Sequence, residues 1–405
     1  MAPNNFFAPY DPNYRLPLAP DTRFRLGLNA EHGSTRTGRN LNHDKSNILQ
    51  IYDCTQSTIA MVMMPTCQIK NNLPIYLPVL TSWAGSPTDD GFRGRIQMTG
   101  EFEQTDLTVY GSYIFYQRLF PGDLSLSVYL PVRHASTSNI QFTNLTRSNT
   151  EADLDINAFL AGFTNFKNSL CATANLDLNP VSKTGLGDLL FMLNWENDFR
   201  QDKEILKNVT MYAMLGLSFP TGVKKDENRA FSVALGNDGA VGMPIGLGLE
   251  LDFVHHITAG LDVDFLILFD ETRDRRLKTD FRQTEFLLLN KGRSTKDHGL
   301  TWMFNLFLEA FHFVGGLSAK VDYEYIKHDD DRLTAKSDAF NNAVINSAKT
   351  LEEWNMHHFI FQLSYDFFNE CKTVVPQVKL FYKLPVTGKG IIYPPTFGGQ
   401  LAINF

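Results

Sequence analysis

The stretch Thr396–Phe405 reads TFGGQLAINF and decides the fold. Its large apolar side chains occupy alternate positions, at Phe397, Leu401, Ile403 and Phe405. Successive side chains of a β-strand point to opposite faces of the sheet. The stretch therefore predicts a strand with one apolar and one polar face.

The same alternation recurs upstream through most of the chain. The clearest segments are 124–132, 247–253, 261–269, 317–325 and 359–367, in each of which the apolar face carries no charge. Similar segments lie near 22–31, 94–104, 106–118, 186–196, 209–220, 299–311 and 376–384. Together they give about thirteen strands, and because single-chain bacterial barrels have an even number we expect 14, with 12 or 16 open. The missing strand would lie in 34–92 or 135–185.

The composition points to a barrel in lipid. The chain has 32 Phe and 14 Tyr among 405 residues, yet its mean hydropathy is −0.19 and no run is long and apolar enough for a transmembrane helix. A sheet closed on itself, apolar outside and polar inside, satisfies both observations. The net charge of −7 argues against a nucleic-acid partner, since phosphate binding needs a clustered basic surface. The predicted fold class is all-β, a transmembrane antiparallel β-barrel.

The expected connections differ in length. Short links fall near 119–122, 254–258, 312–315 and 369–375, and long ones near 135–185, 221–243, 271–298, 328–356 and 385–395. Outer-membrane barrels have short periplasmic turns and long extracellular loops, whereas a soluble β-sandwich has no reason to sort its loops. We therefore expect the outer membrane of a diderm bacterium, with lipid as a partner.

The domain prediction is a barrel over 22–405 and an N-terminal periplasmic extension over 1–21, which lacks the features of a signal peptide. Residues 34–92 alternate poorly and could be a plug inside the barrel or a folded outer loop. Within 328–356, a helical pattern places Phe340, Val344, Ala348 and Leu351 on one face, with Ser337 or Asp338 as N-cap. That helix could narrow the mouth or serve packing alone.

The residues predicted to line the pore are charged and fall on the polar faces of the strands. They are Glu101, Glu196, Glu250, Asp252, Asp262, Asp264, Glu309, Asp322 and Glu324, with Arg25, Arg95, Arg133, Lys320 and Lys379. Opposed charges in a wet pore select solutes by charge, and the acidic excess predicts mild cation preference. The alternative is that these ions pair across strands and fill a narrow barrel.

No pattern of catalytic chemistry is present, so the chain is predicted not to be an enzyme and to need no cofactor or metal. The pairs His255-His256 and His357-His358 sit at strand ends, where adjacent rings face opposite sides. Asp329-Asp330-Asp331 could bind a cation or be a solvated loop. One or two disulfides are expected among Cys54, Cys67, Cys171 and Cys371, with Cys54–Cys67 the natural local pair.

Two short motifs carry a resemblance. Gly185-Leu186-Gly187-Asp188 opens one strand, and Pro220-Thr221-Gly222 ends the next. These motifs resemble an outer-membrane transporter family linked to the phenol meta-degradation pathway, whose barrels are related to the fatty-acid transporters. The resemblance implies a monomeric barrel of 12 to 14 strands and passive uptake of small, often hydrophobic molecules. The chain departs from the fatty-acid transporters in lacking their Asn-Pro-Ala hatch signature.

The terminal strand also resembles the last strand of bacterial outer-membrane barrels, whose final aromatic residue is read by the insertion machinery. Phe405 would be that signal. The predicted function is a channel for passive passage of small solutes, mildly cation-preferring, or specific for hydrophobic substrates if plugged. The alternative is a structural or surface-array protein whose loops self-associate into a homo-oligomer.

Overall fold

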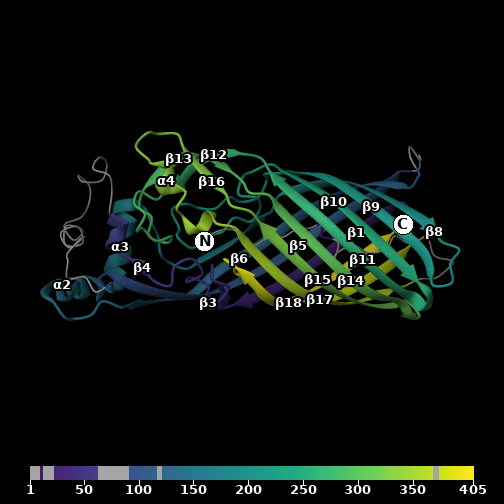
Figure 1. Cartoon of the computed structure of the whole chain (residues 1–405), viewed down its shortest axis with the longest axis horizontal. Helices are drawn as coiled ribbons and strands as arrows, with labels where there is room; N and C mark the ends of the chain where they lie inside the picture. The colour runs from purple at the N-terminus through teal and green to yellow at the C-terminus, as the bar shows by residue number, and fades with distance from the viewer. Residues whose placement is uncertain (1–9, 12–21, 63–90, 116–120, 368–373) are drawn as a thin grey trace.

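The computed structural model describes residues 10–11, 22–62, 91–115, 121–367 and 374–405 and shows a closed antiparallel β-barrel of twelve strands (Figure 1). The barrel strands are β1 Phe24–Thr35, β5 Arg95–Phe115, β6 Asp123–Asn144, β8 Leu189–Arg200, β9 Leu206–Phe219, β10 Gly242–Phe253, β11 Ile257–Leu268, β14 Thr301–Val314, β15 Leu317–His328, β17 Trp354–Asp366, β18 Val375–Lys389 and β19 Thr396–Asn404. Each pairs with the next along the chain, and β1 pairs with β19 to close the ring. Two further strands, β4 Gln56–Ser57 and β7 Val181–Leu186, extend the sheet outside the ring.

The predicted strand number of 14 is wrong, and β5 explains the difference. Segments 94–104 and 106–118 were expected as two strands, but β5 is one strand of 21 residues. Its outward face changes from apolar at Leu107 and Val109 to polar at Glu103 and Thr105, all exposed. That change marks where the strand leaves the apolar band, not where it ends. The described parts of 34–92 and 135–185 add no further strand to the ring.

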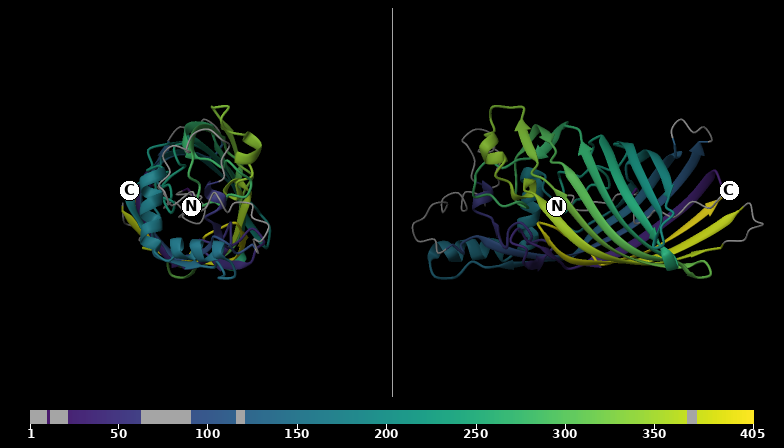
Figure 2. Two further views of the ribbon diagram at one scale, coloured as in Figure 1. Left: turned by 90° about the vertical axis from the view of Figure 1, so that its left-hand side faces the viewer. Right: turned by 45° about the vertical axis from the view of Figure 1, so that its right-hand side comes forward.

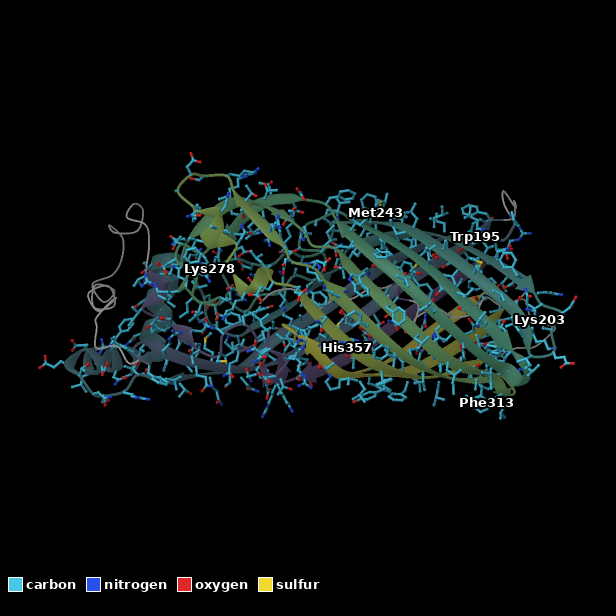
Figure 3. The ribbon with its side chains drawn as sticks, in the orientation of Figure 1. Trp195, Lys203, Met243, Lys278, Phe313 and His357 are labelled. Carbon is cyan, nitrogen blue, oxygen red and sulfur yellow. The ribbon has the colours of Figure 1, made fainter. Side chains whose placement is uncertain are left out.

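The barrel wall shows the alternation that the sequence predicted. Along β1, Arg25, Asn29 and Glu31 are buried inside while Leu26 and Leu28 are exposed outside. The outward positions of the other strands form a continuous apolar band (Figure 3), with members that include Leu126, Leu130, Leu193, Leu215, Leu217, Leu247, Phe265, Leu306, Leu308, Val321, Phe361, Leu363, Leu380, Phe397 and Leu401. Exposed apolar surface of this extent fits contact with lipid, so the barrel spans a membrane.

The two ends of the barrel differ as predicted. At one end the turns are short, as in the 3₁₀ turn η3 Val254–His256 between β10 and β11 and the link between β14 and β15. At the other end the described parts of the long connections gather with the helices and a small sheet, while the C-terminus lies at the short-turn end (Figure 1). The end with long loops is the extracellular side of such a barrel.

The long loops form an outer layer with its own hydrophobic core. It contains the short strands β2 Thr37–Arg39 and β3 Lys45–Asn47, the turn η2 Ala60–Val62, and the helices α2 Glu151–Leu160 and α3 Phe163–Ala174. Thr150 caps α2 in a capping box with Asp153, whose carboxylate also accepts from Arg93 Nε at 2.7 Å. Figure 2 shows the helices beside the mouth of the ring. No helix in the described ranges has the length and hydropathy to cross a membrane.

The first part of residues 34–92 belongs to this outer layer. Ile48, Leu49, Ile51 and Met61 are fully buried with Ile156, Leu160, Phe166 and Leu170 of the two helices. Up to residue 62 the segment is therefore a folded outer loop. A plug is not shown, and residues 63–90 lie outside the described ranges.

A second small core lies under the sheet β12 Glu271–Arg276, β13 Lys291–Asp297 and β16 Arg332–Ala335. It joins Leu277, Leu333, Ile345, Ala348 and Leu351. The predicted helix over Phe340–Leu351 is wrong: α4 Asn342–Ile345 makes one turn, and the 3₁₀ turn η4 Lys349–Leu351 follows. The N-cap is Asn341, whose side chain accepts from the backbone N–H of Ala343, and not Ser337 or Asp338. The apolar stripe packs in this core.

Glycines inside the barrel lie opposite large luminal side chains on the neighbouring strand. The cross-strand pairs are Gly27 with Tyr110, Gly248 with Tyr212, Gly260 with Phe307 and Gly398 with Phe381. In each pair a Cβ on the glycine would overlap the aromatic ring. The absent side chains let the rings lie against the wall, which keeps space open in the lumen.

Two further predictions concern the cysteines and the C-terminal residue. Cys54 and Cys171 are exposed free thiols, so the structure does not support the predicted disulfides, and Cys67 and Cys371 lie outside the described residues. The terminal residue Phe405 lies at the seam between β19 and β1, where its carbonyl accepts from Arg23 N at 2.7 Å.

Candidate functional site

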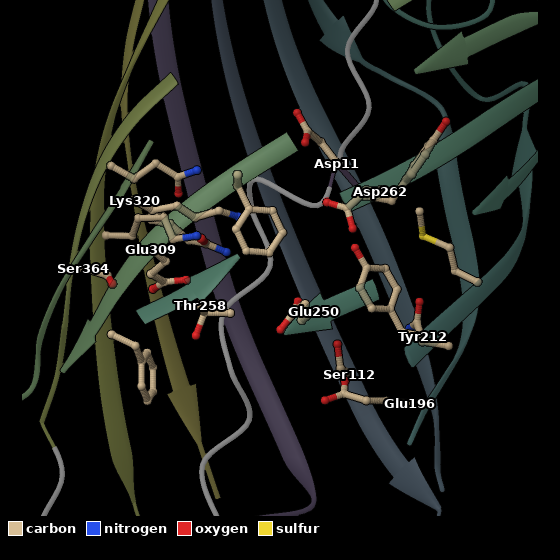
Figure 4. Close-up of a pocket in the computed structure, with 18 of the residues that line it drawn as sticks. Asp11, Ser112, Glu196, Tyr212, Glu250, Thr258, Asp262, Glu309, Lys320 and Ser364 are labelled. Carbon is tan, nitrogen blue, oxygen red and sulfur yellow. The ribbon is translucent and has the colours of Figure 1, made fainter. Parts of the chain in front are cut away.

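A cavity of about 830 Å³ occupies the barrel lumen between its middle and the short-turn end (Figure 4). Its lining residues come from all twelve barrel strands and from the turn after β10, which contributes Val254 and His256. Tyr10 and Asp11 also line it. Most of the side chains that line it occupy inward positions of the strands, where alternate residues of a barrel strand face the lumen and can contact a solute.

Tyr10 and Asp11 lie inside the barrel. Tyr10 packs against Leu190, Met192 and Met214. Asp11 is 5% exposed and lies 3.7 Å from Lys383 Nζ, which is also 3.5 Å from Glu31. Of the segment 1–21, predicted as a periplasmic extension, the structure describes only these two residues, and the others lie outside the described ranges.

One wall of the cavity is acidic. Glu250 and Asp252 on β10 are followed by Asp262 on β11 and Glu309 on β14, and Glu196 and Asp198 add to the wall from β8. Asp252 Oδ1 accepts from Thr258 Oγ1 at 2.8 Å, and Asp198 Oδ1 accepts from Thr210 Oγ1 at 2.6 Å. Hydroxyl donors hold these carboxylates in place without neutralising them.

The basic side chains of the cavity are held by specific partners. Lys320 Nζ lies 3.0 Å from Asp322 and 3.7 Å from the centroid of the Phe307 ring. Arg25 donates from Nε to Asn404 Oδ1 at 2.7 Å and from Nη2 to Gln377 Oε1 at 3.2 Å. Lys379 is a third cation of this wall. These three cations come from the strands β15, β18 and β1, and a fourth, Lys207, lines the cavity from β9.

A third wall is neutral and polar. Ser112 and Ser127 share a hydrogen bond of 2.8 Å, and Asn194 Nδ2 donates to Ser127 at 3.1 Å. Tyr110 stacks on Tyr129 with ring centroids 5.6 Å apart. The cavity therefore offers carboxylates, hydroxyls and aromatic faces to one small solute.

Several of the luminal ions outside the cavity lining pair across strands. Arg133 Nε lies 3.1 Å from Asp106, and His358 Nδ1 lies 3.2 Å from Glu324. Gln362 Nε2 donates to Asp322 Oδ2 at 2.6 Å. For these groups the structure agrees with the alternative that luminal ions pair across strands. Open space lies only beside the luminal charges that line the cavity.

The structure divides the predicted pore-lining residues into three groups. Those that line the cavity are Arg25, Glu196, Glu250, Asp252, Asp262, Glu309, Lys320 and Lys379. Those buried in the barrel outside the cavity lining are Arg133, Asp264, Asp322 and Glu324. Arg95 and Glu101 lie on the outer part of β5 away from the cavity, and Glu101 pairs there with Arg36. That these residues line a path for solutes stays a prediction.

Sequence reasoning missed the neutral lining and the two N-terminal residues. Ser112, Ser127 and Tyr212 occupy the same inward positions as the charged residues, so the alternation could have identified them. Tyr10 and Asp11 gave no signal, because no periodic pattern surrounds them.

The other candidate chemistry is accounted for by local contacts. His357 Nδ1 bonds to Tyr323 on the outside while His358 faces Glu324 inside, which confirms that the two rings point apart. Each carboxylate of Asp329–Asp331 has a protein partner, in Lys327, the Glu353 N–H and Lys296 respectively. Among the described residues no group of His, Cys, Asp or Glu could hold a metal ion.

The two motifs that carry the resemblance meet at the outer rim of the barrel. Asp188 accepts backbone N–H bonds from Gly222 at 2.8 Å and from Asn237. Thr221 Oγ1 donates to the Gly187 carbonyl at 3.0 Å and accepts from Leu189 N at 2.9 Å. We call these four bonds the rim contact. It joins the start of β8 to the loop between β9 and β10, and so brings the two motifs of this chain into contact.

Comparisons with known proteins give likeness of fold. No family model and no curated protein sequence matches the chain. An outer membrane channel from Pseudomonas putida F1 superposes with a TM-score of 0.52 at 12% identity, covering 99% of this chain and 100% of that one. The P. putida toluene transporter TodX gives a TM-score of 0.31 at 10% identity, covering 96% and 91%. The autotransporter AIDA-I transport unit from Escherichia coli gives 0.38 at 9%, covering 97% and 93%.

At these identities the first likeness shows the fold alone. The fold agrees with the closed ring, the apolar band and the sorted loops described above. The chain is therefore a twelve-stranded transmembrane β-barrel of the outer-membrane type.

Proposed function

We propose that the protein is an outer-membrane channel for the passive passage of small solutes. The observation that carries the proposal is the cavity of about 830 Å³ inside a closed barrel, lined by polar side chains and reaching the short-turn end. A barrel that served only as an anchor would have no need for such a space. The P. putida protein with the same fold is described as a channel, which supports the proposal.

The lining charges favour cations over anions. Asp11, Glu196, Asp198, Glu250, Asp252, Asp262 and Glu309 outnumber Arg25, Lys207, Lys320 and Lys379. Fixed charges of one sign in a narrow aqueous path raise the local concentration of the opposite sign. We therefore retain mild cation preference as part of the proposal.

Tyr10 and Asp11 are the narrow part of the proposed path. They lie in the lumen and are held there by the packing of Tyr10 and by Lys383. If they block the path at rest, the channel is specific rather than general, and a hydrophobic or amphipathic solute would have to displace them. This is the plugged form of the proposal.

Planar-bilayer conductance with a salt gradient tests the channel. Stable current steps with a cation-directed reversal potential are expected. The double variant Glu250→Gln/Asp252→Asn should shift the reversal potential toward zero, whereas Glu151→Gln, at an exposed position of α2, should not. Tyr10→Gly should raise the conductance. A correctly folded protein that stays silent with and without Tyr10→Gly would contradict the proposal.

The outer layer supports a second candidate, a surface-array protein. Its loops carry two hydrophobic cores of their own, more structure than a passive pore needs. Self-association in detergent without conductance would favour this function. That the chain is not an enzyme stays a prediction. A homo-oligomer and recognition of Phe405 by the insertion machinery stay predictions as well.

A further inference from the structure

Asp264 is a buried luminal carboxylate that the channel function alone does not explain. It is 3% exposed, on an inward position of β11, and neither carboxylate oxygen has a hydrogen-bond partner among the residues that the structure describes. The side chain lies over Gly246 on β10, beside Met214. Buried carboxylates are normally paired or hydrogen-bonded, because an isolated one is costly.

The charged groups around Asp264 do not compensate it. Those that act on it most strongly are Asp262, Asp11 and Glu324, all acidic. The nearby cations have other contacts: Lys320 lies against Asp322, and Lys383 lies between Asp11 and Glu31. Within the described ranges, no cation therefore compensates the charge of Asp264.

The neighbouring polar atoms also lack donors. Asn305 is fully buried on β14 and donates from Nδ2 to Asp262 Oδ2 at 3.0 Å, while its Oδ1 has no hydrogen-bond partner in the described part of the chain. Asn305 pairs with Asp262 in the register, so it is diagonal to Asp264, within reach of one bridging group. The oxygens of Asp264 and Asn305, on two adjacent strands, could therefore accept hydrogen bonds from a ligand that carries N–H groups.

An aromatic and apolar surface lies next to these oxygens. Tyr10 is close enough for the charge of Asp264 to act on its phenol, and its ring packs with Met214 and Met192. Aromatic faces attract cations, and methionines accommodate alkyl groups. Both Tyr10 and Asp262 line the cavity, which provides the approach from the periplasmic side.

We propose that Asp264, Asn305 and Tyr10 form a binding site for the primary ammonium group of a small organic cation. The ammonium donates to the free oxygens of Asp264 and Asn305, and its short apolar body contacts Tyr10 and Met214. An inorganic metal ion fits less well, since the described residues hold no group of three metal-ligating side chains. The inference names a solute class for the channel and so rests on the proposed function.

The test is ligand binding to the full-length protein in detergent, which does not require conductance. n-Butylammonium chloride is titrated by calorimetry and by thermal unfolding, beside n-butanol and NaCl at equal concentration. Butylammonium should bind and raise the unfolding temperature more than either control. Asp264→Asn should weaken binding by about tenfold or more, because charge-assisted bonds are lost. Asp155→Asn, at an exposed position of α2, should leave the binding of butylammonium unchanged.

The outcomes separate this inference from the channel. Asp264→Asn should also unfold at a higher temperature than wild type without ligand, since an uncompensated buried charge is removed. Equal stabilisation by NaCl, no binding of butylammonium, or unchanged binding in Asp264→Asn would each overturn the site. Binding by a protein that is silent in bilayers would uphold the site and reject the channel. Conductance without binding would do the reverse.

Discussion

At the scale of the residue, the glycine–aromatic pairs of the lumen are a direct test of packing. A Cβ at Gly27 would overlap the Tyr110 ring, whereas a Cβ at Gly111 would lie 3.5 Å from Leu26 in ordinary contact. Gly27→Ala should therefore lower the free energy of unfolding by about 1–3 kcal/mol, and Gly111→Ala should have little effect. Denaturant unfolding in detergent measures both. Adding Tyr110→Ser to Gly27→Ala should recover part of the loss, and a purely additive double variant would contradict the argument.

His298 in the outer layer gives a pH dependence whose sign follows from burial. Burial lowers the pKa of His298 to about 3 from its usual 6.5, and the charge of Lys296 adds to this. The folded state thus favours the neutral ring, so its stabilisation is complete above pH 6.5 and is lost as the pH falls toward 3. Although burial opposes it, Lys296 and His328 hold the pKa of Asp331 below its usual range, which adds a loss at still lower pH.

Hydrogen exchange of the outer loops should therefore accelerate by more than about tenfold between pH 7 and pH 4, after correction for intrinsic rates. His298→Gln should flatten this dependence. The exposed His43, replaced in the same way, serves as control. An unchanged pH profile in His298→Gln would show that another group is responsible.

At the scale of the element, the rim contact holds a loop against a strand. Asp188 accepts from two backbone N–H groups of the β9–β10 loop. Asp188→Ala leaves both without an acceptor and should destabilise that loop by roughly 2–4 kcal/mol. Faster hydrogen exchange over 221–240, with unchanged exchange in β9 and β10, would be the expected result. Asp270→Ala, at an exposed position between β11 and β12, is the matched control. Equal exchange in the two variants would rule the contact out as an anchor.

The elements also show what sequence reasoning could and could not reach. Strands in lipid were predictable, because one face must be apolar throughout, as at Leu26 and Leu28 of β1. The outer part of β5 could not be predicted in this way, since beyond the lipid the outward face of a strand is free to be polar and the alternation disappears. The length of the helix α4 was overestimated, because the spacing of apolar residues indicates which positions are buried and not how far the helix extends. The helix begins after its N-cap Asn341, and a separate 3₁₀ turn begins at Lys349. The position of Tyr10 in the lumen could not be predicted either, because it depends on tertiary contacts with residues far along the chain.

At the scale of the whole molecule, the barrel and the outer layer are stabilised differently. The ring is closed by backbone hydrogen bonds, while the outer layer depends on side-chain cores around Ile156 and Leu277. We expect the outer layer to unfold first on heating in detergent. A first transition should then make α3 sensitive to trypsin at Lys167, while the folded barrel still migrates as such on a gel. A single transition that abolishes both would contradict this division.

The seam between β1 and β19 has a consequence for how the chain is made. Arg25 on β1 bonds to Asn404 across 379 positions, so the first strand to leave the ribosome finds its partner only when the last has been synthesised. Until then β1 has an open edge that could pair with any other chain. Translation that halts before residue 396 would leave a curved sheet with two such edges. Such a truncated product is a substrate for aggregation or proteolysis rather than a smaller barrel.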